Sequence, residues 1–114
     1  MIIHGKERNF LFTVAASEDI AGLCRGGDLE NIGELFEKGT ATDRINAIID
    51  VVVLLNKGYE SAKVFEDPEH VPDVVTKEEL KAIPMNMLKE IEQEALDSIA
   101  IGMGITVETE PEKN

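Results

Sequence analysis

Histidine and carboxylate side chains gather in one short stretch, where together they could hold a metal ion. Asp67, Glu69, His70 and Asp73 place four potential ligands within seven residues, and both groups are common metal ligands. The stretch lacks the central glycine and the twelfth-position glutamate of a calcium-binding EF-hand loop. We therefore interpret it as a solvated acidic loop and expect no metal site.

The other reactive side chains fit structural roles better than catalytic ones. His4 is expected to face Glu7 across a hairpin, as a surface pair. Cys24 falls at the end of a short helix, where the helix dipole disfavours a thiolate, so we interpret it as a small buried side chain. Glu90 and Glu94 share one helix face, but such runs usually face solvent. The sequence predicts no catalytic group and no cofactor site, and so favours a binding protein over an enzyme.

Net charge restricts the partners that the chain could bind. The 114 residues carry a net charge of −12, of which residues 66–114 contribute −9. Such a field repels nucleic acid and anionic membrane surfaces. A single cysteine cannot form an intramolecular disulfide, and residues 1–9 lack the pattern of a signal peptide. We therefore expect a cytoplasmic protein that binds neither nucleic acid nor membranes.

The elements that position these residues predict an α+β fold, with an N-terminal β-hairpin packed against four to five helices. Residues 1–4 and 8–15 would form the hairpin. The dipeptide Gly5-Lys6 would form its two-residue turn, because a type II′ turn needs glycine first. This turn pairs Ile3 with Arg8 and places five apolar side chains on one buried face: Met1, Ile3, Phe10, Phe12 and Val14.

Two short helices are predicted after the hairpin. Ser17 would cap the first, which would stop at Gly26-Gly27 and turn three side chains inward: Ile20, Ala21 and Leu23. Asp28 would cap the second, whose apolar spacing predicts an inward stripe: Leu29, Ile32, Leu35 and Phe36.

The third helix is the most apolar segment of the chain. It would open at Thr42 or Asp43, with a main inward stripe of five residues: Ile45, Ile48, Ile49, Val52 and Val53. It could end at residues 56–58 or continue through Tyr59 and Phe65. Three more apolar residues widen the stripe beyond one face: Val51, Leu54 and Leu55. Such a helix is either central to its domain or covered by a partner.

The C-terminal part is predicted to be helical after an acidic connector over residues 66–75. A capping box at Thr76 would open a short helix that breaks near Pro84. The last helix would run from about residue 86 to 101, with five side chains inward: Met87, Leu88, Ile91, Ala95 and Ile99. Residues 105–109 could add a third strand. One domain over residues 1–109 and a disordered acidic tail over 110–114 are therefore expected.

Surplus apolar residues indicate an interface with a partner or with a second copy of the chain. Five residues of the hairpin and the third helix are the predicted contacts: Phe12, Val51, Leu54, Leu55 and Tyr59. The alternative is that such residues simply fill a core that is poor in aromatic side chains.

The order of these segments resembles the tail assembly chaperones of bacteriophages and prophages of Gram-positive bacteria. The matching segments are GKERNFLFTVAASEDIAGLCRGGDLENIGELF, then LLNKGYESAKVFEDPEH, then VVTKEEL. An F-x-F-T-V-like strand core corresponds to residues 10–14, an L-C-x-x-G-D-like turn to 23–28, and a K-G-Y-E-x-A-K-like helix end to 57–63. The resemblance covers roughly residues 3–95 and departs from the family pattern at residues 25–27.

The resemblance implies a non-enzymatic role in building the phage tail. Such proteins act in the cytoplasm of the host cell, bind the aggregation-prone tape measure protein and help to recruit tail tube subunits, and they are absent from the finished virion. In many relatives a ribosomal frameshift also yields a longer form. The alternative from another class is an acidic regulatory or inhibitor protein that occupies a basic site on a host protein.

Overall fold

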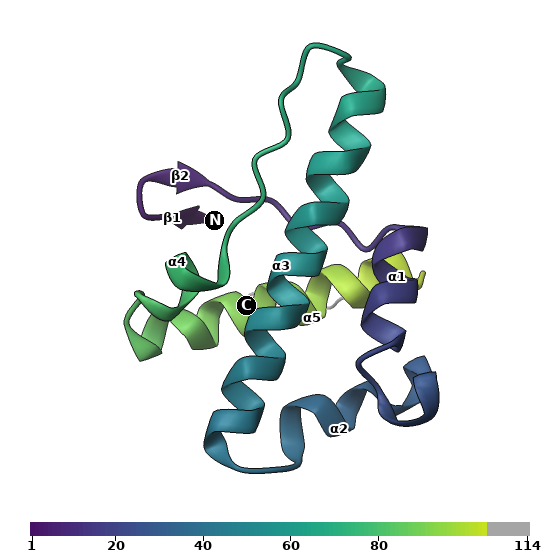
Figure 1. Cartoon of the computed structure of the whole chain (residues 1–114), viewed down its shortest axis with the longest axis vertical. Helices are drawn as coiled ribbons and strands as arrows, with labels where there is room; N and C mark the ends of the chain where they lie inside the picture. Colours follow the sequence, from purple (N-terminus) through teal and green to yellow (C-terminus); the bar gives the residue numbers. More distant parts are fainter. Residues whose placement is uncertain (105–114) are drawn as a thin grey trace, which may run out of the picture.

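The computed structural model describes residues 1–104, which form an α+β fold of a two-stranded hairpin and five α-helices (Figure 1). Two turns of 3₁₀ helix, η1 and η2, connect the first two α-helices. The elements in chain order are β1 (Ile2–Ile3), β2 (Lys6–Glu7), α1 (Val14–Ala21), η1 (Arg25–Gly27), η2 (Leu29–Asn31), α2 (Ile32–Glu37), α3 (Ala41–Glu66), α4 (Lys77–Lys81) and α5 (Met85–Gly102). The predicted strand over residues 105–109 and the predicted tail lie outside the described residues.

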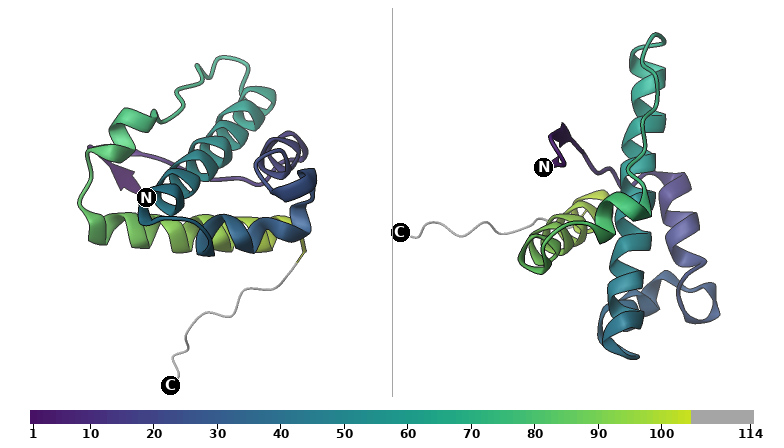
Figure 2. Two further views of the ribbon diagram at one scale, coloured as in Figure 1. Left: turned by 60° about the horizontal axis from the view of Figure 1, so that its bottom comes forward. Right: turned by 60° about the vertical axis from the view of Figure 1, so that its left-hand side comes forward.

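Helix α3 is the centre of the fold. Helices α1 and α2 pack on one side of it, α4 packs on the other, and α5 crosses it (Figures 1 and 2). Thr40 caps α3 and forms a capping box with Asp43, so the helix begins slightly earlier than predicted. It continues without a break to Glu66, which is the longer of the two alternatives. Its C-terminal turns project beyond the other helices (Figure 2).

The hydrophobic core lies around the middle of α3 and is almost wholly aliphatic. Full burial of one Leu or Ile side chain contributes about 1.5–3 kcal/mol. The apolar stripes predicted for α2 and α5 are confirmed, because they pack on this core. The buried members include Ile20, Ile48, Ile49, Val52, Leu55, Leu88, Ile91, Ala95 and Ile99, and the partly buried ones include Leu29, Ile32, Leu35, Phe36 and Met87.

The hairpin is shorter than predicted and has a different register. Ile3 pairs with Lys6, not with Arg8. The turn therefore lies at His4 and Gly5, whose φ angles of 50° and 80° fit a type I′ turn. The predicted position of the turn was wrong by one residue, because Gly5 can serve both as the first residue of a type II′ turn and as the second residue of a type I′ turn.

Residues 8–13, which we call the N-terminal strap, were predicted as strand but cross α3 without a strand partner among the described residues. The backbone N–H of Leu11 donates a hydrogen bond of 3.1 Å to the carbonyl oxygen of Leu55. Gly58 permits this close crossing, because a Cβ atom at that position would lie 2.5 Å from the Leu11 carbonyl oxygen.

Helix α1 begins one turn earlier than predicted. Its N-cap is Thr13 rather than Ser17. Val14 was assigned to the buried hairpin face, but it is the first helical residue and is 80% exposed. The helix ends at its C-cap, Gly22, and the predicted glycine stop, Gly26-Gly27, belongs to η1 instead.

Residues 67–76, the C-terminal strap, run back along α3 from its projecting end to α4 (Figure 1). Asn56 is fully buried between the two straps. Its side-chain oxygen accepts from the backbone N–H of Val75 at 2.7 Å, and its side-chain nitrogen donates to the carbonyl oxygen of Asn9 at 2.9 Å. A single α3 side chain therefore fixes both straps. The predicted capping box at Thr76 then opens α4, as expected.

Candidate partner-binding surface

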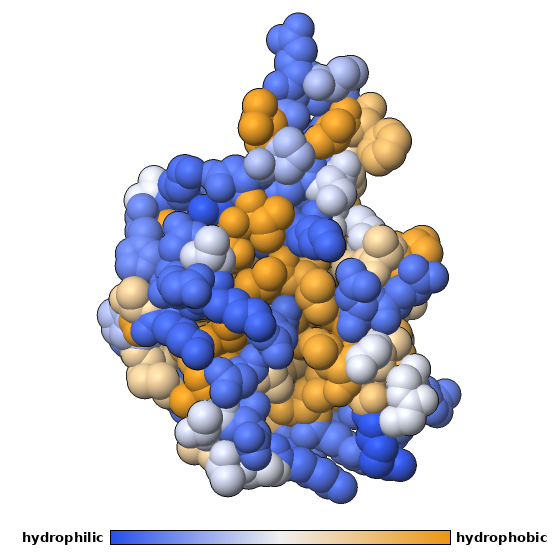
Figure 3. Space-filling model, in the orientation of Figure 1, coloured by the Kyte–Doolittle hydropathy of each residue, from blue (hydrophilic) through white to orange (hydrophobic). Residues whose placement is uncertain are grey.

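Within the described residues 1–104, one side of α3 is left uncovered by the other helices. Residues spaced three or four apart lie on the same side of a helix, and those on this side are half-buried or exposed: Asp43, Ala47, Asp50, Leu54, Lys57, Ser61 and Phe65. Phe65 stands on the projecting end of α3 with 90% of its surface exposed. Figure 3 shows a broad hydrophobic area across the middle of one molecular face, bordered by hydrophilic side chains.

Two shallow hollows of about 230 and 200 Å³ lie beside this side of α3 and share Leu23 and Asp50. We call them together the front groove. Leu23 was predicted to point inward, but it is 39% exposed and lines both hollows. Leu35 and Leu54 provide further apolar lining. Asp50 forms an ion pair of 3.0 Å with Lys77 of α4 at the edge of the groove.

Of the five predicted contact residues, two are excluded from direct contact. Val51 and Leu55 have no exposed surface, because they point into the core that α3 shares with the other helices. Phe12, Leu54 and Tyr59 are half-buried, and their contact with a partner stays a prediction. Among these three, only Leu54 lines the front groove.

Sequence reasoning missed Leu23 and Phe65 as surface residues. Leu23 was assigned inward because α1 was extended too far along the chain. Phe65 was recognised only as a continuation of the apolar pattern of α3, and nothing local reveals that the end of that helix projects. A Phe in the last turn before an acidic, proline-containing segment is the one signal that could have marked it.

The acidic loop that suggested a metal site is part of the C-terminal strap. The side chain of Glu60 on α3 lies 2.6 Å from His70 Nε2 and accepts from the backbone N–H of Asp73 at 3.0 Å. Lys6 and Arg8 contact the Asp73 side chain, and the hydrogen bond from Lys6 is the largest cause of its lowered pKa. Within residues 1–104 no group of three or more His, Cys, Asp or Glu side chains is arranged to hold a metal ion.

The remaining candidate groups are also engaged in structural contacts. His4 Nε2 lies 2.9 Å from the carbonyl oxygen of Glu79, so the predicted pairing of His4 with Glu7 is wrong. The shift of the turn by one residue explains this difference, because His4 lies in the turn itself. Cys24 is buried as predicted, and burial raises the pKa of its thiol.

Arg8 is the one charged residue of the N-terminal strap, and its side chain is buried. Its guanidinium donates to the Asp73 carbonyl oxygen and lies 3.5 Å from Glu79 Oε1. Its Nε has no protein hydrogen-bond partner among the described residues. These contacts join the segment after the hairpin to the C-terminal strap and to α4.

No protein-family model matches the chain, and comparisons with curated proteins and with solved structures also give no match. None of the helices within residues 1–104 combines the length and the hydrophobicity that crossing a membrane requires.

Proposed function

We propose that this protein is a non-catalytic tail assembly chaperone of a bacteriophage or prophage. It would bind the tape measure protein in the host cytoplasm, help to recruit tail tube subunits, and be absent from the finished virion. The proposal is based on the order of segments over residues 3–95 and on the uncovered side of α3, since the comparisons with known proteins add no support.

The front groove and the projecting Phe65 are the observation that carries the proposal. Contiguous apolar surface rimmed by polar groups is typical of protein interaction sites. A client with long apolar helices could place one of them along α3, with its side chains against Leu23 and Leu54. The net charge of −12 would keep the resulting complex dispersed.

Co-purification with the tape measure protein from the same gene cluster tests this function. Wild-type protein should recover the tape measure protein in soluble form, and the double variant Leu23→Ser/Phe65→Ser should recover several-fold less. Val14→Ser is the matched control, because Val14 is also an exposed apolar residue but lies in α1, neither in the front groove nor on the projecting end of α3. Loss of recovery in the control, or no recovery by the wild type together with normal tail assembly in its absence, would refute the proposal.

The position of the gene gives a second test. A location between the tail tube and tape measure genes is expected for a tail assembly chaperone. A gene outside any tail cluster, with capture of a basic host protein instead, would favour the acidic inhibitor.

A further inference from the structure

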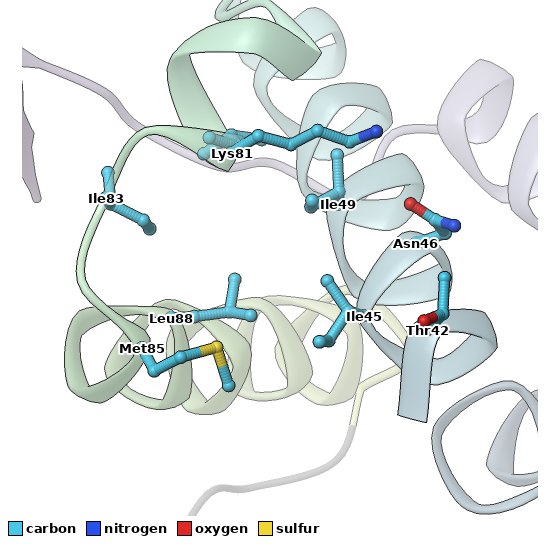
Figure 4. A pocket seen from close by; sticks show the side chains of 9 residues that line it. Thr42, Ile45, Asn46, Ile49, Lys81, Ile83, Met85 and Leu88 are labelled. Carbon is cyan, nitrogen blue, oxygen red and sulfur yellow. The ribbon is translucent and has the colours of Figure 1, made fainter. Parts of the chain in front are cut away.

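A second groove, which adjoins the front groove at Asn46, lies where α3, α4 and α5 meet. It consists of a hollow of about 380 Å³ and an adjoining one of about 220 Å³, which share Ile45, Met85 and Leu88. Figure 4 shows the larger hollow, with aliphatic side chains of α3 facing those of α5 and of the segment before it. Its volume lies within the range of about 300–1,000 Å³ that is typical of ligand sites.

The apolar lining of this groove suits an apolar side chain of a partner. Ile45 and Leu88 form its walls, and Met85, which both hollows share, is 57% exposed. The thioether of methionine is flexible and polarisable, so methionine adapts to partners of different shape. Thr42 and Asn46 add polar groups at the α3 edge (Figure 4).

The rim of this groove is basic, unlike the chain as a whole. Lys81 lines the larger hollow, and Arg44 and Lys89 line the smaller one. Among the ten basic residues that the structure describes, only four lie farther than 4.0 Å from every described carboxylate: Arg44, Lys57, Lys81 and Lys89. Three of these four border this one groove, and Glu92 is the only carboxylate among its lining residues within the part of the chain that the structure describes.

The charge of the whole chain restricts what could bind there. A long polyanion such as nucleic acid would meet the net charge of −12 beyond the rim. A short segment with a few carboxylates needs only the local positive charge, and its apolar side chains would fill the hollows. Acidic residues placed opposite a basic rim also favour association with the correct partner.

We propose that this groove binds an acidic, amphipathic segment of a partner protein, with an aromatic or long aliphatic side chain in the larger hollow and carboxylates facing Lys81, Lys89 and Arg44. The front groove differs in charge, because its lining residues Asp43 and Asp50 outnumber Lys77. The molecule would therefore offer two surfaces that select partners of different charge.

Fluorescence anisotropy with short labelled peptides tests this inference on the full chain. The peptides share one helical pattern of Phe and Leu and carry Glu, Gln or Lys at all other positions. We expect the Glu peptide to bind about tenfold more tightly than the Gln peptide, in a salt-dependent manner, and the Lys peptide to bind most weakly.

Charge reversal locates the binding site. Lys81→Glu should weaken binding of the Glu peptide about tenfold, and Lys81→Glu/Lys89→Glu should reverse the preference towards the Lys peptide. Lys57→Glu is the matched control, because it makes the same change in net charge outside the groove and should leave binding within about twofold. Circular dichroism would verify that each variant is folded.

The inference would be overturned by no binding of the Glu peptide, by equal binding of the Glu and Gln peptides, or by equal effects of Lys81→Glu and Lys57→Glu. A change of oligomeric state caused by Lys81→Glu, without a change in peptide binding, would assign the groove to a second copy of the chain and overturn it too. The peptides contain no tape measure sequence, so failure here leaves the chaperone proposal untouched.

Discussion

Replacing Gly58 by alanine should destabilise this protein, although the same change in most helix interiors is stabilising. Alanine has a helix propensity about 1 kcal/mol more favourable than glycine. At position 58, however, the new Cβ atom would lie 2.5 Å from the Leu11 carbonyl oxygen and 3.1 Å from Thr13 Oγ1. The Leu11 oxygen is a backbone atom, and Thr13 Oγ1 is held in place as the N-cap that accepts from the Ala16 N–H, so the N-terminal strap must move.

The expected loss of stability follows from the contacts that this movement of the strap disrupts. The hydrogen bond from Leu11 N–H to the Leu55 carbonyl oxygen has a net contribution of about 0.5–1.5 kcal/mol. Overpacking of a tight contact costs about 1–3 kcal/mol. After subtraction of the gain in helix propensity, we expect a loss of about 1–3 kcal/mol, which for a chain of this size lowers Tm by roughly 4–12 °C.

Gly33→Ala is the matched control. Gly33 lies in α2, and a Cβ atom there would meet nothing within 4 Å. This variant should be neutral or raise stability by up to about 1 kcal/mol. Thermal unfolding followed by circular dichroism compares the two. If Gly58→Ala raises Tm as much as Gly33→Ala does, the close crossing of the strap over α3 is wrong.

Three further predictions concern the hydrogen bonds of Asn56, the ion pair of Asp73 and the burial of Cys24. Asn56→Ala should lower the free energy of unfolding by about 2–4 kcal/mol in urea titrations, because it removes two hydrogen bonds and leaves the Val75 N–H buried without a partner; an effect no larger than that of a surface substitution would contradict this. The hydrogen bond from Lys6 lowers the pKa of Asp73 in the folded state. The ionised Asp73 therefore stabilises the fold at pH values above its unfolded-state pKa, and this stabilisation is lost as the pH falls through its folded-state pKa. Wild-type protein should therefore lose more stability than Asp73→Asn as the pH falls below about 4, and parallel pH profiles would refute the assignment. Cys24 should react with a thiol reagent much more slowly in native buffer than in denaturant, because it is buried and its pKa is raised; equal rates would show that the thiol is accessible.

The features that the sequence predicts correctly are those that local chemistry determines. The capping box at Thr76 requires residues three positions apart in the chain, and the structure contains both of its hydrogen bonds. The stripe from Leu29 to Phe36 follows helical spacing, and all its members pack on the core. Leu88 and Ile91 of α5 are buried for the same reason.

The features that the sequence does not predict depend on contacts between distant segments. Ser17 has acidic neighbours and is a good N-cap on local grounds, but Thr13 lies where the strap meets Gly58 on α3. Val51 and Leu55 belong to a helix that is apolar on several sides, and periodicity alone cannot say which side is covered. The basic rim likewise joins residues from α3, the end of α4 and α5, which no local pattern connects.

The buried contacts of Arg8 also constrain the order in which the chain can fold during synthesis. Its partner Asp73 lies 65 residues later in the sequence. Until the ribosome has released that segment, Arg8 lacks its buried partner, although the N-terminal strap can already contact Leu55 and Gly58 of α3. Domains generally fold as units as the chain is made. Here Arg8 must wait for the C-terminal strap, 65 residues later in the chain, before it can be buried.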